Sequence, residues 1–191
     1  MKLNFSLILI AIICASVSLT ASSPDPSSRA DNLQWGQPSD GLQMSLSPTD
    51  ANGSNLQVAF RNVGDHDITL NLGSMMANGK VQLPDDVHIN FTDAQGRSRV
   101  FKFADKKHSG VAGRLDDYVV PLRAGSMYTF KLGLDEFWCP ETIEFEIPLL
   151  PGKNQLAVQF HGSGARLSNS DIKLMNFWLG NVESNTLTIE R

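Results

Sequence analysis

The sequence LQVAFRNVGDHDITLNL at residues 56–72, followed by VHINFTDAQGRSRVFKF at residues 87–103, decides the fold. In both stretches apolar residues alternate with polar ones, and short polar breaks separate the runs. Because the side chains of a β-strand point to opposite faces with a period of two, this alternation indicates strands with one buried and one solvated face. Four such strands in succession predict an antiparallel sheet that packs against a second layer.

The same alternation predicts further strands on either side of this stretch. They lie at residues 41–47, 118–122, 128–132, 143–149, 156–160 and 185–190. The segment at 118–122 contains Pro121, which predicts an edge strand or a bulge because proline cannot donate a hydrogen bond to a neighbouring strand. About nine or ten short strands without an amphipathic helix predict an all-β protein, an antiparallel immunoglobulin-like β-sandwich.

Short polar breaks between the strands predict how neighbouring strands pair. Residues 55–62 and 67–72 are expected to form a hairpin through Gly64. Residues 87–92 and 98–103 are expected to form a second hairpin over an Asp-Ala-Gln-Gly turn, since these residue types favour tight turns.

Three longer segments are predicted to lie outside the strands. Residues 73–86 are interpreted as a long connection. Residues 104–113 are polar, charged and glycine-containing, which is typical of a mobile loop. Residues 172–177 are interpreted as one short helical turn.

The beginning of the sequence has the layout of a secretory signal peptide. Lys2 supplies a positive charge, residues 7–17 form an apolar run, and small residues follow. The apolar run is too short to cross a bilayer comfortably, so we expect cleavage between Ser18 and Ser23 and export to the periplasm or the extracellular space. A membrane anchor that stays attached is the alternative.

Composition and charge indicate the domain organisation and exclude two classes of partner. Residues 1–22 are assigned to the signal, residues 23–32 to a flexible tether rich in Ser, Pro and Asp, and residues 33–191 to one β-sandwich domain. A hydrophobic content of 41% is enough for a core, and the net charge of −4 is mildly acidic. Without a basic stripe we expect no nucleic-acid partner, and no membrane association once the signal is removed.

Cysteine and histidine usage argues against a disulfide framework and a metal site. Of two cysteines, Cys14 lies in the signal, which leaves Cys139 without a partner in the mature chain. Its neighbours Phe137, Trp138 and Pro140 predict a buried, inert thiol. The four histidines show no metal-ligand spacing and nucleotide-binding motifs are absent, so no cofactor and no enzymatic activity are expected.

Acidic pairs are the remaining candidates for chemistry. They occur at Asp85-Asp86, Asp116-Asp117 and Asp135-Glu136. Carboxylates on neighbouring loops can bind calcium or act as an acid and base pair. Adjacent residues of a strand point to opposite faces, however, so we favour solvated loop charge.

Five aromatic residues outside the cleanest alternation are the candidates for a binding surface. They are Trp35, Phe137, Trp138, Phe177 and Trp178. Three of them on one face would form a platform for a sugar or a peptide. We favour the alternative that they close the ends of the sandwich, because large aromatic side chains are mostly buried.

Several segments resemble bacterial immunoglobulin-like modules. VAFRNVGDHDITLNL and VHINFTDAQGRSRVFKF resemble the middle strands of these modules, and VPLRAGSMYTFKL resembles one of their turns. LLPGKNQLAVQF resembles the start of another strand, although Asn154-Gln155 replace the usual tyrosine, and FWLGNVESNTLTI is similar to the closing strand of exported bacterial sandwich domains. The resemblance covers residues 56–160 and implies the sandwich fold. It also extends loosely to the bacterial intracellular proteinase inhibitors, which implies protease inhibition as one possible activity.

The sequence therefore predicts an exported, non-enzymatic binding or structural module for an unknown protein or carbohydrate partner. One alternative is a protease inhibitor that uses an exposed loop, either residues 73–86 or the loop with Lys106, Lys107 and His108. The other alternative is a hydrolase built from loop carboxylates.

Overall fold

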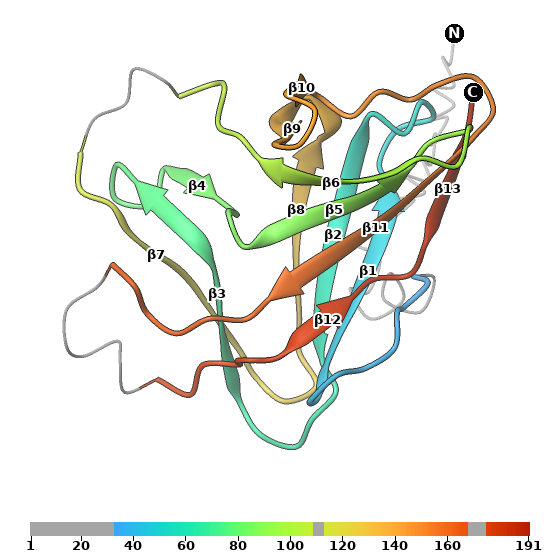
Figure 1. Ribbon diagram of the computed structural model, residues 1–191. Helices are drawn as coiled ribbons and strands as arrows, with labels where there is room; N and C mark the ends of the chain where they lie inside the picture. Colours follow the sequence, from blue (N-terminus) through green and yellow to red (C-terminus); the bar gives the residue numbers. More distant parts are fainter. Residues whose placement is uncertain (1–32, 109–112, 168–174) are drawn as a thin grey trace, which may run out of the picture. The chain divides into compact units, whose positions relative to one another are not determined.

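The computed structural model describes residues 33–108, 113–167 and 175–191, and thirteen β-strands lie in this part of the chain. Apolar residues form the buried faces of all of them except the two-residue strand Glu144–Phe145. All pairings between these strands are antiparallel. Helical structure in the described residues is limited to one 3-10 turn, Leu134–Glu136, and no helix there is long and apolar enough to cross a membrane. The protein is therefore all-β with antiparallel sheets, as predicted (Figure 1).

The strands form three sheets (Figure 1). The first has the order β1-β2-β8, with β1 Leu42–Pro48, β2 Asn55–Asn62 and β8 Met127–Gly133. The second has the order β4-β3-β7, with β3 Ile68–Met76, β4 Val81–Leu83 and β7 Asp116–Leu122. The third, which we call the large sheet, has the order β10-β9-β6-β5-β11-β12, and β13 also pairs with β11. Its strands are β5 Val87–Thr92, β6 Ser98–Phe103, β9 Phe137–Cys139, β10 Glu144–Phe145, β11 Lys153–His161, β12 Asn181–Glu183 and β13 Leu187–Glu190.

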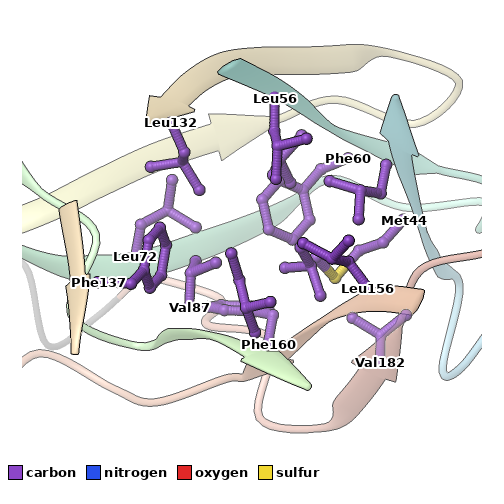
Figure 2. Close-up of a cluster of buried hydrophobic side chains, with 14 of the residues drawn as sticks. Met44, Leu56, Phe60, Leu72, Val87, Leu132, Phe137, Leu156, Phe160 and Val182 are labelled. Atoms are coloured by element: carbon purple, nitrogen blue, oxygen red, sulfur yellow. The ribbon is translucent and has the colours of Figure 1, made fainter. Parts of the chain in front are cut away.

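The first sheet and the large sheet face each other across a shared hydrophobic core. Figure 2 shows side chains from both sheets pointing toward one another. Phe60 of β2 meets Phe160 of β11 edge to face, with ring centroids 5.2 Å apart, and both side chains are fully buried. Burial of each such side chain contributes about 1.5–3 kcal/mol, so this contact is a main source of stability.

The hairpin of β5 and β6 is confirmed, and so is the assignment of β7 as an edge strand. The buried carboxylate of Asp93 accepts hydrogen bonds from the backbone N–H groups of Gln95 and Arg97, each 3.0 Å long. These bonds fix the tight turn between the two strands. Pro121 lies on β7, which has no strand partner beyond β3 in the described residues.

The predicted hairpin through Gly64 is wrong. β2 pairs with β1 and β8, whereas β3 pairs with β4 and β7, so the intervening residues cross between sheets. The buried side chain of Asn62 fixes this crossing. Its Nδ2 donates to the carbonyl oxygens of His66 and Leu122, and its Oδ1 accepts from the Gly64 N–H.

Two further strand predictions are also wrong. Residues 73–86 are not a long connection, because β3 continues to Met76 and turns at residues 77–80 into β4. The strand expected at residues 143–149 is reduced to the two residues of β10. The backbone of Ile143 and Glu146 has φ of +57° and +79°, and this left-handed conformation cannot continue a strand.

Several predictions fall outside the described residues. They are the signal and tether at 1–32, residues 109–112 of the polar loop, and residues 172–174 of the helical turn expected at 172–177. Within the described part of that last segment, Phe177 makes an isolated parallel bridge with Thr69 of β3 instead of a helical turn.

Candidate binding surface on the large sheet

The register of the large sheet places one row of side chains across five strand-to-strand pairings. Residues paired across antiparallel strands lie on the same face of a sheet. The row, which we call the transverse row, consists of Phe145, Trp138, Lys102, His88, Gln159 and Glu183. It points away from the core, because the residues that alternate with it, such as Ile89, Phe101 and Phe160, are buried. With strands about 4.8 Å apart, the row is about 24 Å long.

Small and neutral side chains lie beside the transverse row on the same face, which we call the outer face. One neighbouring row consists of Val100, Asn90 and Ala157, and the next of Ser98, Thr92, Gln155 and Thr188. The hydroxyls of Thr92 and Ser98 are hydrogen bonded at 2.9 Å. Between β5 and β6 the surface is hollowed by about 230 Å³, with Asn90, Thr92, Ser98, Val100 and Glu141 in the lining.

Two aromatic side chains form one end of the transverse row. Trp138 of β9 and Phe145 of β10 are register partners, with ring centroids 6.4 Å apart and planes within 19° of each other. Phe145 is 61% exposed. The ammonium group of Lys106 lies 5.7 Å from the centre of the Phe145 ring, within the range of a cation–π contact.

The short strand β10 is held in a strained position. Ile143 and Glu146 flank it with positive φ, which costs on the order of 1–3 kcal/mol for each non-glycine residue. The N–H of Ile143 donates to the carbonyl of Cys139 at 2.9 Å, and the N–H of Glu146 donates to the carbonyl of Phe137 at 2.7 Å. These hydrogen bonds stabilise the strained backbone conformation. As a result, Phe145 lies beside Trp138 instead of in the core.

An arginine fixes β10 from the opposite side of the sheet. The guanidinium of Arg99 binds the carboxylate of Glu144 and lies 3.3 Å from the carboxylate of Asp93. The Arg99 side chain is 11% exposed and lies over the rings of Phe91 and Phe101. Burial acts to raise the pKa of Asp93, but hydrogen bonds from Arg97 and Gln95 together lower this pKa below its ordinary value. The Asp93 carboxylate therefore remains an anionic partner for Arg99.

Charges on the outer face cancel. Among the described strand residues of this face, the charged ones are Lys102, Lys153, Glu183 and Glu190, and Lys153 is the register partner of Glu190. Burial, and then the positive charge of Lys102, lowers the pKa of His88 below its ordinary value. His88 is therefore neutral at pH 7, and the charges of the strand residues on this face balance in a chain whose net charge is −4.

The structure separates the five aromatic residues that the sequence singled out. Phe137 and Trp178 are buried in the core, where Trp178 stacks on Phe160 and its indole N–H donates to the carbonyl of Asp40. Trp35 is half-buried over the guanidinium of Arg61 on β2, and Phe177 lies beside β3. Only Trp138 belongs to the outer face, so the five do not form one platform.

Sequence reasoning missed Phe145, the exposed aromatic residue at the end of the transverse row. Its alternation with Ile143 and Ile147 indicated a buried side chain, whereas the structure exposes it. The signal that could have found it is the polar pair Glu141-Thr142 after Pro140, which is typical of a turn and would have made Phe145 a neighbour of Trp138.

The loop with Lys106, Lys107 and His108 is braced where it is described. The Asp105 carboxylate accepts hydrogen bonds from the backbone N–H groups of Lys107 and His108, each 3.0 Å long. The Lys107 ammonium lies 2.6 Å from the carboxylate of Glu136. These contacts fix residues 105–108 and place Lys106 beside Phe145.

The acidic pairs hold loops in place. Asp85 accepts from the Ser74 hydroxyl at 2.5 Å, and Asp86 accepts from Arg166 at 2.7 Å. The buried carboxylate of Asp117 accepts from the backbone N–H groups of Arg166 and Leu167. Burial, and the nearby charge of Asp86, raise the pKa of Asp85 above its ordinary value. In the described ranges no group of three or more acidic, His or Cys residues is arranged to hold a metal ion.

Cys139 is buried with a free thiol on β9, as predicted. Its side chain belongs to the core, behind the outer face that carries Trp138. The thiol therefore contributes to packing and is shielded from solvent.

No protein-family model matches the chain, and no curated protein matches it. The function has to be inferred from the residues of the chain, above all from those of the outer face.

Proposed function

We propose that this chain is an exported, non-enzymatic binding module with an immunoglobulin-like β-sandwich fold, and that it binds its ligand through the outer face of the large sheet. The observation that carries the proposal is the transverse row with Phe145 at its end. A large aromatic side chain that is 61% exposed, on a two-residue strand flanked by strained residues, is unfavourable for stability alone. Binding explains why it is kept at the surface.

The arrangement of sheets supports the immunoglobulin-like assignment. The first sheet and the large sheet face each other across one core, and after β2 the chain crosses from the first sheet to the β4-β3-β7 sheet. Crossing connections of this kind are typical of immunoglobulin-like sandwiches. The signal-like sequence at residues 1–22 supports export.

Binding fits the outer face better than catalysis does. Two of its titratable groups, His88 and Glu183, are separated by Gln159 in the transverse row. Two strand spacings amount to about 9–10 Å, which is too far for direct proton transfer between the two groups. The neighbouring amides and hydroxyls can form hydrogen bonds, but none of them is a nucleophile activated by a base in the described geometry.

Site-specific photo-crosslinking in the source cells tests this proposal without knowledge of the ligand. A photoreactive phenylalanine analogue at Phe145 should form an adduct of higher mass. The same analogue at Leu179, which is 67% exposed but lies outside the large sheet, should not. Equal adducts at both positions, or none at Phe145, would refute the outer face as the binding surface.

Protease inhibition is a second candidate, because the bracing by Asp105 and Glu136 favours it. A loop that is ordered before binding loses less conformational entropy in a protease cleft. Lys106 is exposed within this braced segment and offers a basic residue to trypsin-like enzymes. The test is to mix each protease of a panel with an equimolar amount of the chain and to measure the protease activity that remains. Inhibition that is lost in Lys106→Ala but kept in Lys80→Ala would favour protease inhibition over binding through the outer face.

A further inference from the structure

We propose that the ligand of the outer face is a neutral polysaccharide whose chain lies across the strands, along the transverse row, with one sugar ring against Trp138 and Phe145. This inference rests on the proposed function and adds the chemical class of the ligand. The face offers the three features that such a ligand requires: an aromatic end, neutral hydrogen-bonding groups along its length, and balanced charges on its strand residues.

The aromatic end suits the apolar face of a sugar ring. Sugar rings carry C–H groups on their flat faces, and these pack against aromatic rings that are held in fixed planes. Trp138 and Phe145 are stacked with planes within 19° of each other, so each ring helps to hold the other in a fixed plane. The hydrogen bonds that hold Ile143 and Glu146 keep these rings in place before a ligand arrives.

The rest of the row suits hydroxyl groups. A sugar hydroxyl both donates and accepts hydrogen bonds, and side-chain amides and a neutral imidazole each offer a donor and an acceptor to it. Gln159 and His88 lie in the row and Asn90 lies beside it. Asn90 Nδ2 donates to Glu183 Oε1 at 3.3 Å, which leaves the Asn90 amide oxygen directed to neither Glu183 nor the core. The hollow of about 230 Å³ is smaller than the roughly 300–1,000 Å³ of a pocket for a drug-sized ligand, which fits a single sugar unit.

The balance of charge selects a neutral ligand. Acidic glycans and nucleic acids bind in grooves with an excess of Lys and Arg. On the outer face Lys102 and Lys153 are matched by Glu183 and Glu190, so such a groove is not formed by the described strand residues.

A peptide fits less well. Addition of a peptide strand needs a long free edge. The edges of the large sheet are β10, with two residues between two residues of positive φ, and the short strands β12 and β13, with three and four residues. A bound peptide helix needs an apolar groove, whereas the exposed apolar residues on this face are Val100 and the aromatic end.

Affinity electrophoresis of the folded chain tests the proposal. Native gels would contain hydroxyethyl cellulose, laminarin or dextran as neutral polysaccharides, and alginate or polygalacturonate as acidic ones. We expect retardation in at least one neutral gel, weakened roughly tenfold by Phe145→Ala and by Gln159→Ala. Leu179→Ala, a change at a residue as exposed as Phe145, should migrate like the unmodified chain. Thermal melting of each variant verifies that it is folded.

Each other outcome counts against the proposal in a defined way. Retardation in acidic gels alone, or binding to a peptide array that Phe145→Ala abolishes, overturns the neutral glycan but leaves the outer face as the binding surface. If the chain is retarded in neutral gels but neither Phe145→Ala nor Gln159→Ala weakens the retardation, both the glycan position along the transverse row and the outer face as the binding surface are overturned. No retardation in any gel overturns the glycan, and photo-crosslinking at Phe145 then decides whether the face binds anything else.

Discussion

The side-chain amide of Asn185 pairs with the backbone of Leu46 as a strand would. Its Oδ1 accepts from the Leu46 N–H at 2.7 Å, and its Nδ2 donates to the Leu46 carbonyl at 3.1 Å. Leu46 lies on β1, the edge of the first sheet, and Asn185 lies between β12 and β13. One side chain thus ties the first sheet to the large sheet.

Asn185→Ala should therefore lower the free energy of unfolding by about 1–3 kcal/mol, because it leaves two backbone groups of Leu46 without their partners. Urea denaturation followed by fluorescence measures the change. Asn52→Ala, in an exposed loop, is the matched control and should stay within about 0.5 kcal/mol of the unmodified chain. Equal stability of both variants would show that water replaces the Asn185 amide without loss.

Stability should fall in mild acid because of His88. Its pKa is lowered in the folded chain, first by burial and then by Lys102, from an ordinary value of 6.5. Below about pH 6.5 the unfolded chain binds this proton more readily than the folded chain, so acid favours unfolding. The loss grows until the pH falls below the lowered pKa of the folded state.

Urea midpoints between pH 7.5 and 5 measure this effect, and His88→Gln should flatten the profile over that interval. Carboxylates with lowered pKa, such as Asp93 and Asp105, lose their contribution only as the pH falls below about 4. An unchanged slope in His88→Gln would mean that another group titrates in this window.

Cys139→Ser should leave ligand binding unchanged and cost about 1–3 kcal/mol, since the buried hydroxyl replaces a thiol inside the core. Cys139→Ala, which adds no polar group, should cost less than the serine variant. Binding in the affinity gels and melting temperature are measured together. Loss of binding with unchanged melting would point to a reactive thiol.

Trypsin should cut after Lys106 or Lys107 before it cuts within any strand, because exposed polar loops are the usual sites of proteolysis. The Lys107 ammonium is held by Glu136, so Glu136→Gln should raise the share of cleavage after Lys107. Mass spectrometry of a limited digest gives both rates. First cleavage within β5 or β11 would contradict the expected order.

The sequence was sufficient to predict those parts of the fold that depend on residues close together in the chain. The turn between β5 and β6 was predictable because Asp93 and Gly96 lie within four residues of each other and close it by themselves. The pairing of β2 was not, because the partner groups of Asn62 include the carbonyl of Leu122, which lies 60 residues away. Adjacent strands in the sequence were therefore assigned to each other although they belong to different sheets.

The candidate site was predictable only in part, for a similar reason. Trp138 was named, but its neighbour Phe145 was assigned to a longer strand at residues 143–149 and not to the binding surface. Ile143 is β-branched, a residue type that favours strands, so nothing local predicts its left-handed backbone. That conformation depends on the hydrogen bond to Cys139, and it determines where the next two residues lie.

The position of β11 has a consequence for the time course of folding. This strand pairs with β5, β12 and β13, so the large sheet is joined only when a late segment of the chain meets a much earlier one. The chain loses the conformational entropy of closing this long loop before the contacts between the strands form, and this makes folding slow. During that interval the β5–β6 hairpin presents an unsatisfied edge, and this is the period in which the chain depends most on protection from aggregation.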